Sequence, residues 1–170
     1  MQSNPAEVFI HYLKQLNDII SKVEIHMQRD PDILEARLCA DMLPFINQVS
    51  TTVNFALRAC YPLADMETVL LQREAESVAG LKQQIAAALQ VLNAIPAEQI
   101  TIEKEGLIRE KAGFSELALP RAEFLYFYAL PNFFFHMSMV YAIARARGVP
   151  LSKGDFDGYH QYPVNFSFEK

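Results

Sequence analysis

Three polar residues, Tyr128, Asn132 and His136, are spaced four apart within residues 124 to 144, the longest run of the sequence without Lys, Arg, Asp or Glu. In a helix this spacing places their side chains on one face. An imidazole can serve as a base or bind a metal ion, and a phenol and an amide can donate and accept hydrogen bonds. Because the rest of that face is apolar, we expect these groups either to be hydrogen-bonded within the core or to bind a ligand.

A second set of polar residues is expected to approach this face from other helices. Asp41 and Gln48 are seven residues apart and therefore share a helix face, on which Gln48 borders the apolar residues Phe45 and Val49. His26 follows the apolar positions of the first helix and could approach Asp41 if the first two helices form a hairpin, making an acid–base pair. The candidate ligand-binding residues are therefore Gln48, Tyr128, Asn132, His136, Asp41 and His26.

Four segments have the apolar spacing of helices that could position these residues. The first helix is predicted from Pro5 to about Met27 and the second from about Met42 to Cys60. The third is predicted from about Glu74 to Ile95, and the fourth from Pro120 or Arg121 to Gly148, a residue typical of helix ends. Within the fourth, Pro131 removes the bond to the carbonyl of Phe127, so a bend is expected there. The pattern predicts an all-α four-helix bundle.

The connections between these helices indicate topology. The link between the second and third helices has about a dozen residues and can span about 40 Å, whereas an 18-residue helix is about 27 Å long. This link could therefore cross the bundle and leave the two helices parallel. The link from Pro96 to Pro120 alternates in part and is interpreted as a loop that can contain a short hairpin. We expect a single domain over residues 1–170, with 149–170 a C-terminal tail.

Composition excludes some classes of function. The formal net charge of −5 and a pI near 5.4 argue against a nucleic-acid partner. The uncharged run is long enough to span a bilayer, but its central proline, asparagine and histidine do not suit lipid, so we expect no membrane span. Two isolated cysteines and no recognised signal peptide indicate a cytoplasmic protein. No phosphate-binding loop, nucleophile elbow, CxxC or HExxH motif is present, so the sequence leaves open whether the chain is an enzyme.

The C-terminal tail is rich in aromatic residues: Phe156, Tyr159, Tyr162, Phe166 and Phe168. Such side chains are rarely left in water. We expect residues up to about Phe156 to pack on their own bundle, and the last dozen residues to cover a neighbouring subunit, which predicts a homodimer. His11 falls opposite Phe9 on the first helix and is expected to face solvent.

The segments RLCADMLPFINQV and ALPNFFFHMSMVYAIARARGVPLSKGDF resemble an uncharacterised bacterial domain-of-unknown-function family. That family is similar in fold to the DinB/YfiT-like superfamily of up-down-down-up four-helix bundles. The resemblance covers nearly the whole chain, and PNFFFH and GVPLSKGDF are its most specific parts. It implies a divalent metal held by three histidines, one on the second helix and an H-x-x-x-H pair on the fourth. It also implies the hydrolase or thiol-transferase activity of some members.

In this sequence, the resemblance implies that His136 occupies the position of the second histidine of that pair and Asn132 the position of the first. Gln48 would occupy the position of the ligand on the second helix. Amides are poor ligands for zinc, nickel or iron, so we expect no cofactor, with a divalent transition metal on His136 as the alternative. The sequence therefore predicts a polar pocket between the second and fourth helices that binds a small ligand or is only structural. The alternative is a degenerate metal-dependent hydrolase or transferase of the DinB-like type.

Overall fold

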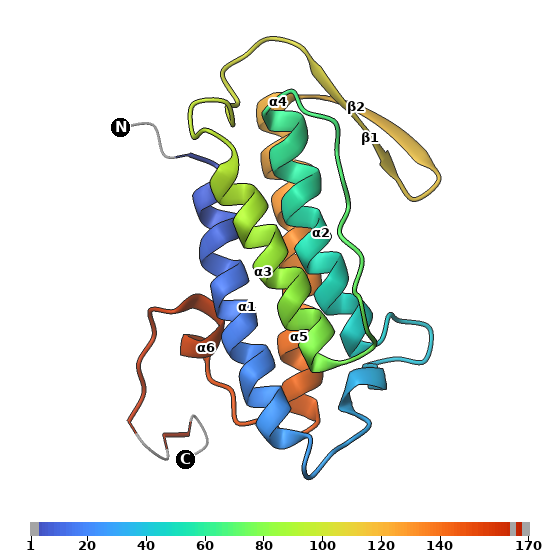
Figure 1. Cartoon of the computed structure of the whole chain (residues 1–170), viewed down its shortest axis with the longest axis vertical. Coiled ribbons are helices and arrows are strands. Elements are labelled where there is room, and N and C mark those ends of the chain that lie inside the picture. The colour runs from blue at the N-terminus through green and yellow to red at the C-terminus, as the bar shows by residue number, and fades with distance from the viewer. Residues whose placement is uncertain (1–3, 164–165, 168–170) are drawn as a thin grey trace.

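The computed structural model describes residues 4–163 and 166–167 and is predominantly helical, as the sequence predicted (Figure 1). Its long helices are α1 (Ala6–His26), α2 (Phe45–Leu63), α3 (Val78–Ala94) and α5 (Leu130–Ala146). Its shorter helical segments are η1 (Ile33–Glu35), α4 (Arg121–Glu123), η2 (Phe124–Ala129) and α6 (Lys153–Asp157). The strands β1 (Leu107–Ala112) and β2 (Ser115–Pro120) form an antiparallel pair.

The long helices lie side by side (Figure 1). In that view α1 and α5 run downward, whereas α2 and α3 both run upward, because the linker between α2 and α3 returns along the length of the helices. The backbone of this linker is tied to a side chain of α2: Asn54 Nδ2 donates to the Leu71 carbonyl at 3.1 Å, and the Leu71 N–H donates to Asn54 Oδ1 at 2.9 Å. The linker is therefore an ordered strap rather than a loose loop.

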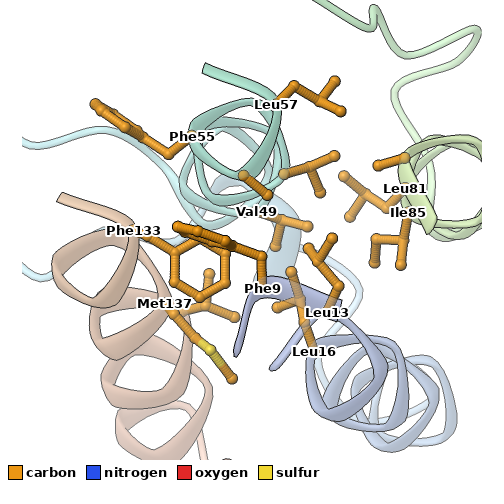
Figure 2. Packing of buried hydrophobic residues seen from close by; sticks show 14 of the residues in the cluster. Phe9, Leu13, Leu16, Val49, Phe55, Leu57, Leu81, Ile85, Phe133 and Met137 are labelled. Atoms are coloured by element: carbon orange, nitrogen blue, oxygen red, sulfur yellow. The ribbon is translucent and has the colours of Figure 1, made fainter. Parts of the chain in front are cut away.

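The core is built from the apolar stripes that the helical spacing predicted. Phe9, Leu13 and Leu16 on α1 are fully buried, and Figure 2 shows them beside Phe133 of α5. The rings of Phe9 and Phe133 meet edge to face with their centroids 5.0 Å apart. Each side chain of this size contributes about 1.5–3 kcal/mol when fully buried. Packing of these stripes therefore holds α1 and α5 together.

The boundaries of α2 differ from those predicted. The helix begins at Phe45 rather than near Met42. Pro44 has an extended backbone (ψ 161°), so the helical conformation does not continue to the residues before it. It also continues past Pro62 to Leu63. A proline in the last turn removes only one helical bond, and the chain still closes there because the Ala64 N–H donates to the Cys60 carbonyl at 3.0 Å. The predicted end at Cys60 was therefore too early.

The predicted fourth helix is continuous from Arg121 through α4, η2 and α5, but its first turns contain a π-helical segment. In η2 the Leu130 N–H donates to the carbonyl of Leu125, five residues back, instead of four. Pro131 follows at once and has no N–H to continue an α-helical pattern. Sequence reasoning expected a bend at Pro131; the structure shows a wider turn just before it. At the other end Gly148 has a φ of +86°, the left-handed conformation expected of it.

The hairpin expected between the third and fourth helices is confirmed. β1 and β2 pair from Leu107↔Pro120 to Ala112↔Ser115, and Gly113 supplies a positive φ of 61° in the turn. This hairpin matters to the site described below because Glu110 of β1 reaches α2.

The tail packs on the long helices as far as the sequence predicted. The Phe156 ring of α6 lies 5.8 Å from Tyr12 and 5.9 Å from Tyr141 between ring centroids. The prediction that His11 faces solvent was wrong: its Nε2 lies 2.8 Å from the carbonyl of Asp157, and its ring stacks on Tyr159 at 5.2 Å. The sequence missed this contact because its partners come from the other end of the chain. Phe168 lies outside the described residues, and the homodimer stays a prediction.

Within the described residues, no helix combines the length and the apolar character needed to cross a membrane.

Candidate functional site

Gln48 and His136 meet where α2 packs against α5. His136 Nδ1 lies 2.7 Å from Gln48 Oε1, and Gln48 is only 1% exposed. The amide nitrogen of Gln48 donates to the Leu43 carbonyl at 3.3 Å, which leaves Oε1 to face the imidazole. An amide oxygen can only accept, so His136 Nδ1 must carry the hydrogen. Gln48 therefore selects one tautomer, in which Nε2 holds the free lone pair.

Two aromatic rings hold the imidazole of His136 in place. Phe55 of α2 stacks on it with ring centroids 5.5 Å apart and an interplanar angle of 21°, and Phe135 meets it edge-on at 5.1 Å. In Figure 2 Phe55 points from α2 away from Leu81 and Ile85, on the side of the helix opposite α3. Its position there allows the Phe55 ring to form one wall of the site.

The charge state of His136 follows from this setting. Burial lowers the pKa of His136 below its ordinary value of 6.5, and the positive charge of Arg58 lowers it further. His136 is partly buried, so its imidazole is neutral at neutral pH. Among the described residues, no hydrogen-bond partner is recorded for His136 Nε2. The site therefore presents an oriented, neutral hydrogen-bond acceptor.

A charged cluster borders the imidazole. Arg58 Nη2 donates to Tyr128 Oη at 2.9 Å, to Glu110 Oε1 at 2.7 Å and to the Lys111 carbonyl at 2.8 Å. The Arg58 guanidinium also lies over the Phe55 ring, 4.6 Å from its centroid. Burial raises the pKa of Tyr128, so its hydroxyl keeps its proton. Because this hydroxyl accepts from Arg58, its hydrogen is directed elsewhere and can be donated.

Asn132 lies on the same helix face as His136 but bonds to neither Gln48 nor His136. Its Nδ2 donates to the carbonyl of Tyr128 at 2.7 Å, one turn earlier, and no contact to Gln48 or His136 is recorded. Its Oδ1 is therefore a second acceptor on the same face. The i, i+4 spacing grouped Tyr128, Asn132 and His136, but only Tyr128 and His136 bond to α2. Asn132 bonds to the backbone of its own helix.

The structure does not bring Asp41 and His26 into these contacts. Asp41 is exposed in the connection before α2. His26 Nε2 lies 2.9 Å from the carbonyl of Arg147, so this histidine ties the end of α1 to the end of α5. Neither residue has a recorded contact with Gln48 or His136. The suggested acid–base pair has no geometric support in the described residues.

Arg58 and Phe55 were missed by sequence reasoning, although Arg58 carries a signal. It is the only charged residue between Phe45 and Leu63, in a helix that is mostly buried. A lone charge in such a helix must find a partner. That partner, Glu110, lies 52 residues away on a hairpin, so spacing alone could not identify it.

The side chains present do not fit the three-histidine metal centre that the resemblance implied. The described residues contain no group of three or more His, Cys, Asp or Glu side chains that could hold a metal ion. Gln48 Oε1, the donor expected from α2, is turned toward His136 Nδ1 instead. A single imidazole flanked by amides is a poor ligand set for zinc, nickel or iron. We therefore derive no chemistry through a metal.

The fold is similar to that of a solved protein of the DinB class. A crystal structure of a DinB family member protein from Shewanella denitrificans superposes with a TM-score of 0.80 at 26% sequence identity, over 94% of this chain and 92% of that chain. The molecule is thus a DinB-like helical protein. More specifically, the chain belongs to the family described as Domain of unknown function (DUF1993), whose model matches residues 3–157. A comparison with curated proteins found no match.

Proposed function

We propose that this protein binds a small polar ligand at the contact between α2 and α5, with His136 Nε2 as the principal acceptor. The observation that carries the proposal is the bond of 2.7 Å between His136 Nδ1 and Gln48 Oε1, since it leaves Nε2 as the lone-pair nitrogen. His136 is only partly buried, so a ligand can reach a ring nitrogen that no protein group bonds. Here one nitrogen is bonded and the other has no recorded partner in the described part of the chain.

The neighbouring groups define the chemistry of the ligand. His136 Nε2 and Asn132 Oδ1 both accept, whereas the hydroxyl of Tyr128 donates. Arg58 is already compensated by Glu110, which argues against a ligand that needs a free cation. The complement is a small neutral molecule with hydroxyl or amide N–H donors and at least one acceptor. The flat wall of Phe55 suits an apolar edge on that molecule.

The arrangement of the helices supports this position for a ligand. The directions of α1, α2, α3 and α5 in Figure 1 support the proposal that these helices form an up-down-down-up four-helix bundle. Bundles commonly bind ligands between facing helices, through side chains that project from both. Gln48 and His136 are such a facing pair.

Nuclear magnetic resonance titration of the histidine side chains tests the proposal. Small hydroxyl and amide compounds, such as glycerol, acetamide and urea, would be added singly while the ring nitrogens of all four histidines are observed. We expect a saturable shift of His136 Nε2 for at least one compound, with His26 unchanged because its Nε2 is bonded to Arg147. His136→Gln should abolish binding of that compound. Equal shifts at every histidine, or none at His136, would contradict the proposal and leave the structural role.

A further inference from the structure

A separate pocket of about 790 Å³ lies at the end of the bundle where α1 begins. Its walls come from the start of α1, from the loop that follows α3, and from η2 with the first residue of α5, which converge at the top of Figure 1. Small-molecule sites typically have volumes of about 300–1,000 Å³. None of its lining residues belongs to the Gln48–His136 site. It is therefore a second, independent location for a ligand.

Part of the inner surface of this pocket is apolar. Among the lining residues, Ile100 is 2% exposed and Leu125 is 3% exposed, and the aliphatic surface also includes Val8, Ile102 and Leu130. Tyr126 lines the same pocket and remains 54% exposed. An aromatic ring left this open beside an apolar hollow is available to a ligand.

The charged residues that line the pocket are all acidic, and all three are exposed. Glu7, Glu98 and Glu103 line it, and no Lys, Arg or His does. No hydrogen bond or ion pair is recorded for these three carboxylates among the residues that the structure describes. The negative net charge of the whole chain adds to this field. A cation would therefore be attracted, whereas an anion would be repelled.

The unusual backbone of η2 shapes the same pocket. Leu125 and Tyr126 both belong to this π-helical segment, in which Leu125 accepts from the Leu130 N–H. A π turn carries one more residue than an α turn, so it changes the direction of the side chains that follow. Such segments are frequent at functional sites. The π-helical distortion therefore lies in the wall of the pocket.

We propose that this pocket binds a small organic cation that carries an apolar group, such as an alkylammonium compound. The apolar part would lie against Val8, Ile100 and Leu125, and the cationic head would face the carboxylates and the Tyr126 ring. Ammonium groups bind aromatic faces in this way, and nearby carboxylates strengthen the attraction. This inference goes beyond the proposed function and does not depend on it.

Calorimetric titration with three probes separates the parts of this inference. Hexyltrimethylammonium has both the cation and the apolar chain, hexanoate has a similar chain with the opposite charge, and tetramethylammonium has the charge without the chain. We expect saturable binding of one hexyltrimethylammonium per chain and at least tenfold weaker binding of the other two. Equal binding of hexanoate, or no saturable binding of hexyltrimethylammonium, would overturn the proposal.

Two matched sets of substitutions locate the binding. The triple variant Glu7→Gln, Glu98→Gln and Glu103→Gln should weaken hexyltrimethylammonium at least tenfold. A control triple variant, Glu35→Gln, Glu67→Gln and Glu74→Gln, removes the same charge from exposed positions outside the pocket and should change the affinity less than twofold. Equal loss in both would mean a general effect of net charge and would refute the site.

Tyr126→Leu supplies a test that leaves all the charges in place. It keeps an apolar side chain and removes the aromatic face. We expect hexyltrimethylammonium to bind at least threefold more weakly to this variant. An unchanged affinity would remove Tyr126 from the site and contradict the proposed placement of the cation.

Discussion

His136 on α5 and Gln48 on α2, 88 residues apart in sequence, are joined by a hydrogen bond of 2.7 Å across the contact between these helices. The bond uses Nδ1 of the imidazole and the amide oxygen of an almost fully buried glutamine. The relationship links packing to chemistry, because the same contact that aligns two helices also decides which ring nitrogen keeps its lone pair.

Removal of either partner should destabilise the protein. Gln48→Ala and His136→Ala each leave a polar group without its partner, and we expect each to lower the free energy of unfolding by about 1–3 kcal/mol. Because the two side chains contact each other, the double variant should lose less stability than the sum of the losses in the two single variants. The expected coupling energy is about 0.5–3 kcal/mol. Urea denaturation of the four proteins measures this cycle. Strict additivity would show that the bond contributes no stability.

Stability should also depend on pH through His136. The pKa of His136 is lower in the folded protein than its ordinary value of 6.5, because burial disfavours the charged form. The contribution of neutral His136 to the free energy of unfolding is therefore complete above pH 6.5. It is lost as the pH falls toward the pKa of the folded state, since the unfolded chain then binds a proton that the folded chain does not. One such group changes the unfolding free energy by at most about 1.4 kcal/mol per pH unit.

His136→Gln isolates this contribution, since it removes the titrating ring and keeps a polar side chain. The slope of unfolding free energy between pH 5 and 6.5 should be smaller in this variant than in the natural protein. His26→Gln serves as the control, because this histidine is not part of the site. Identical slopes in the natural protein and His136→Gln would contradict the lowered pKa.

The sequence predicted the elements of the fold better than their ends. Apolar spacing located the long helices, and alternation located the hairpin, because these patterns reflect burial along each element. The start of α2 at Phe45 and the π turn before Pro131 were not predicted, since both depend on the backbone geometry of neighbouring prolines. Local patterns do not contain this information.

The candidate site was predicted in part for a similar reason. Spacing grouped Tyr128 with His136, and the resemblance suggested Gln48 as the residue on the second helix, which contacts His136. It could not show that Arg58 joins Tyr128 to Glu110, because those partners lie on a hairpin and on another helix. The 790 Å³ pocket was missed entirely, since its walls come from three separate parts of the chain.

Two substitutions should create a metal site in this protein. We expect protein purified without a histidine tag to contain less than stoichiometric zinc, nickel or iron, because its amides are poor ligands. Gln48→His combined with Asn132→His places three imidazoles on α2 and α5 and should produce metal binding. Metal content by mass spectrometry measures both. Stoichiometric metal in the natural protein, lost in His136→Ala, would mean that His136 is a ligand together with residues other than Gln48 and Asn132.

The oligomeric state tests the expectation about the tail. We predict a homodimer in which residues 158–170 cover a neighbouring subunit, because this segment is rich in aromatic side chains; Tyr159 remains 74% exposed and Phe166 47% exposed. Sedimentation at micromolar protein concentration should show a dimer that dissociates when these residues are deleted. A monomer with the same sedimentation before and after the deletion would count against the prediction.

The most direct test of the account is the tautomer of His136, observed by nitrogen-15 nuclear magnetic resonance of the imidazole at pH 7. The bond to Gln48 predicts a neutral ring with the hydrogen on Nδ1 and a free lone pair on Nε2. Gln48→Leu should remove this preference and shift the population toward the other tautomer. A hydrogen on Nε2 in the natural protein, or a charged ring at pH 7, would contradict the claim that Gln48 prepares His136 as an acceptor.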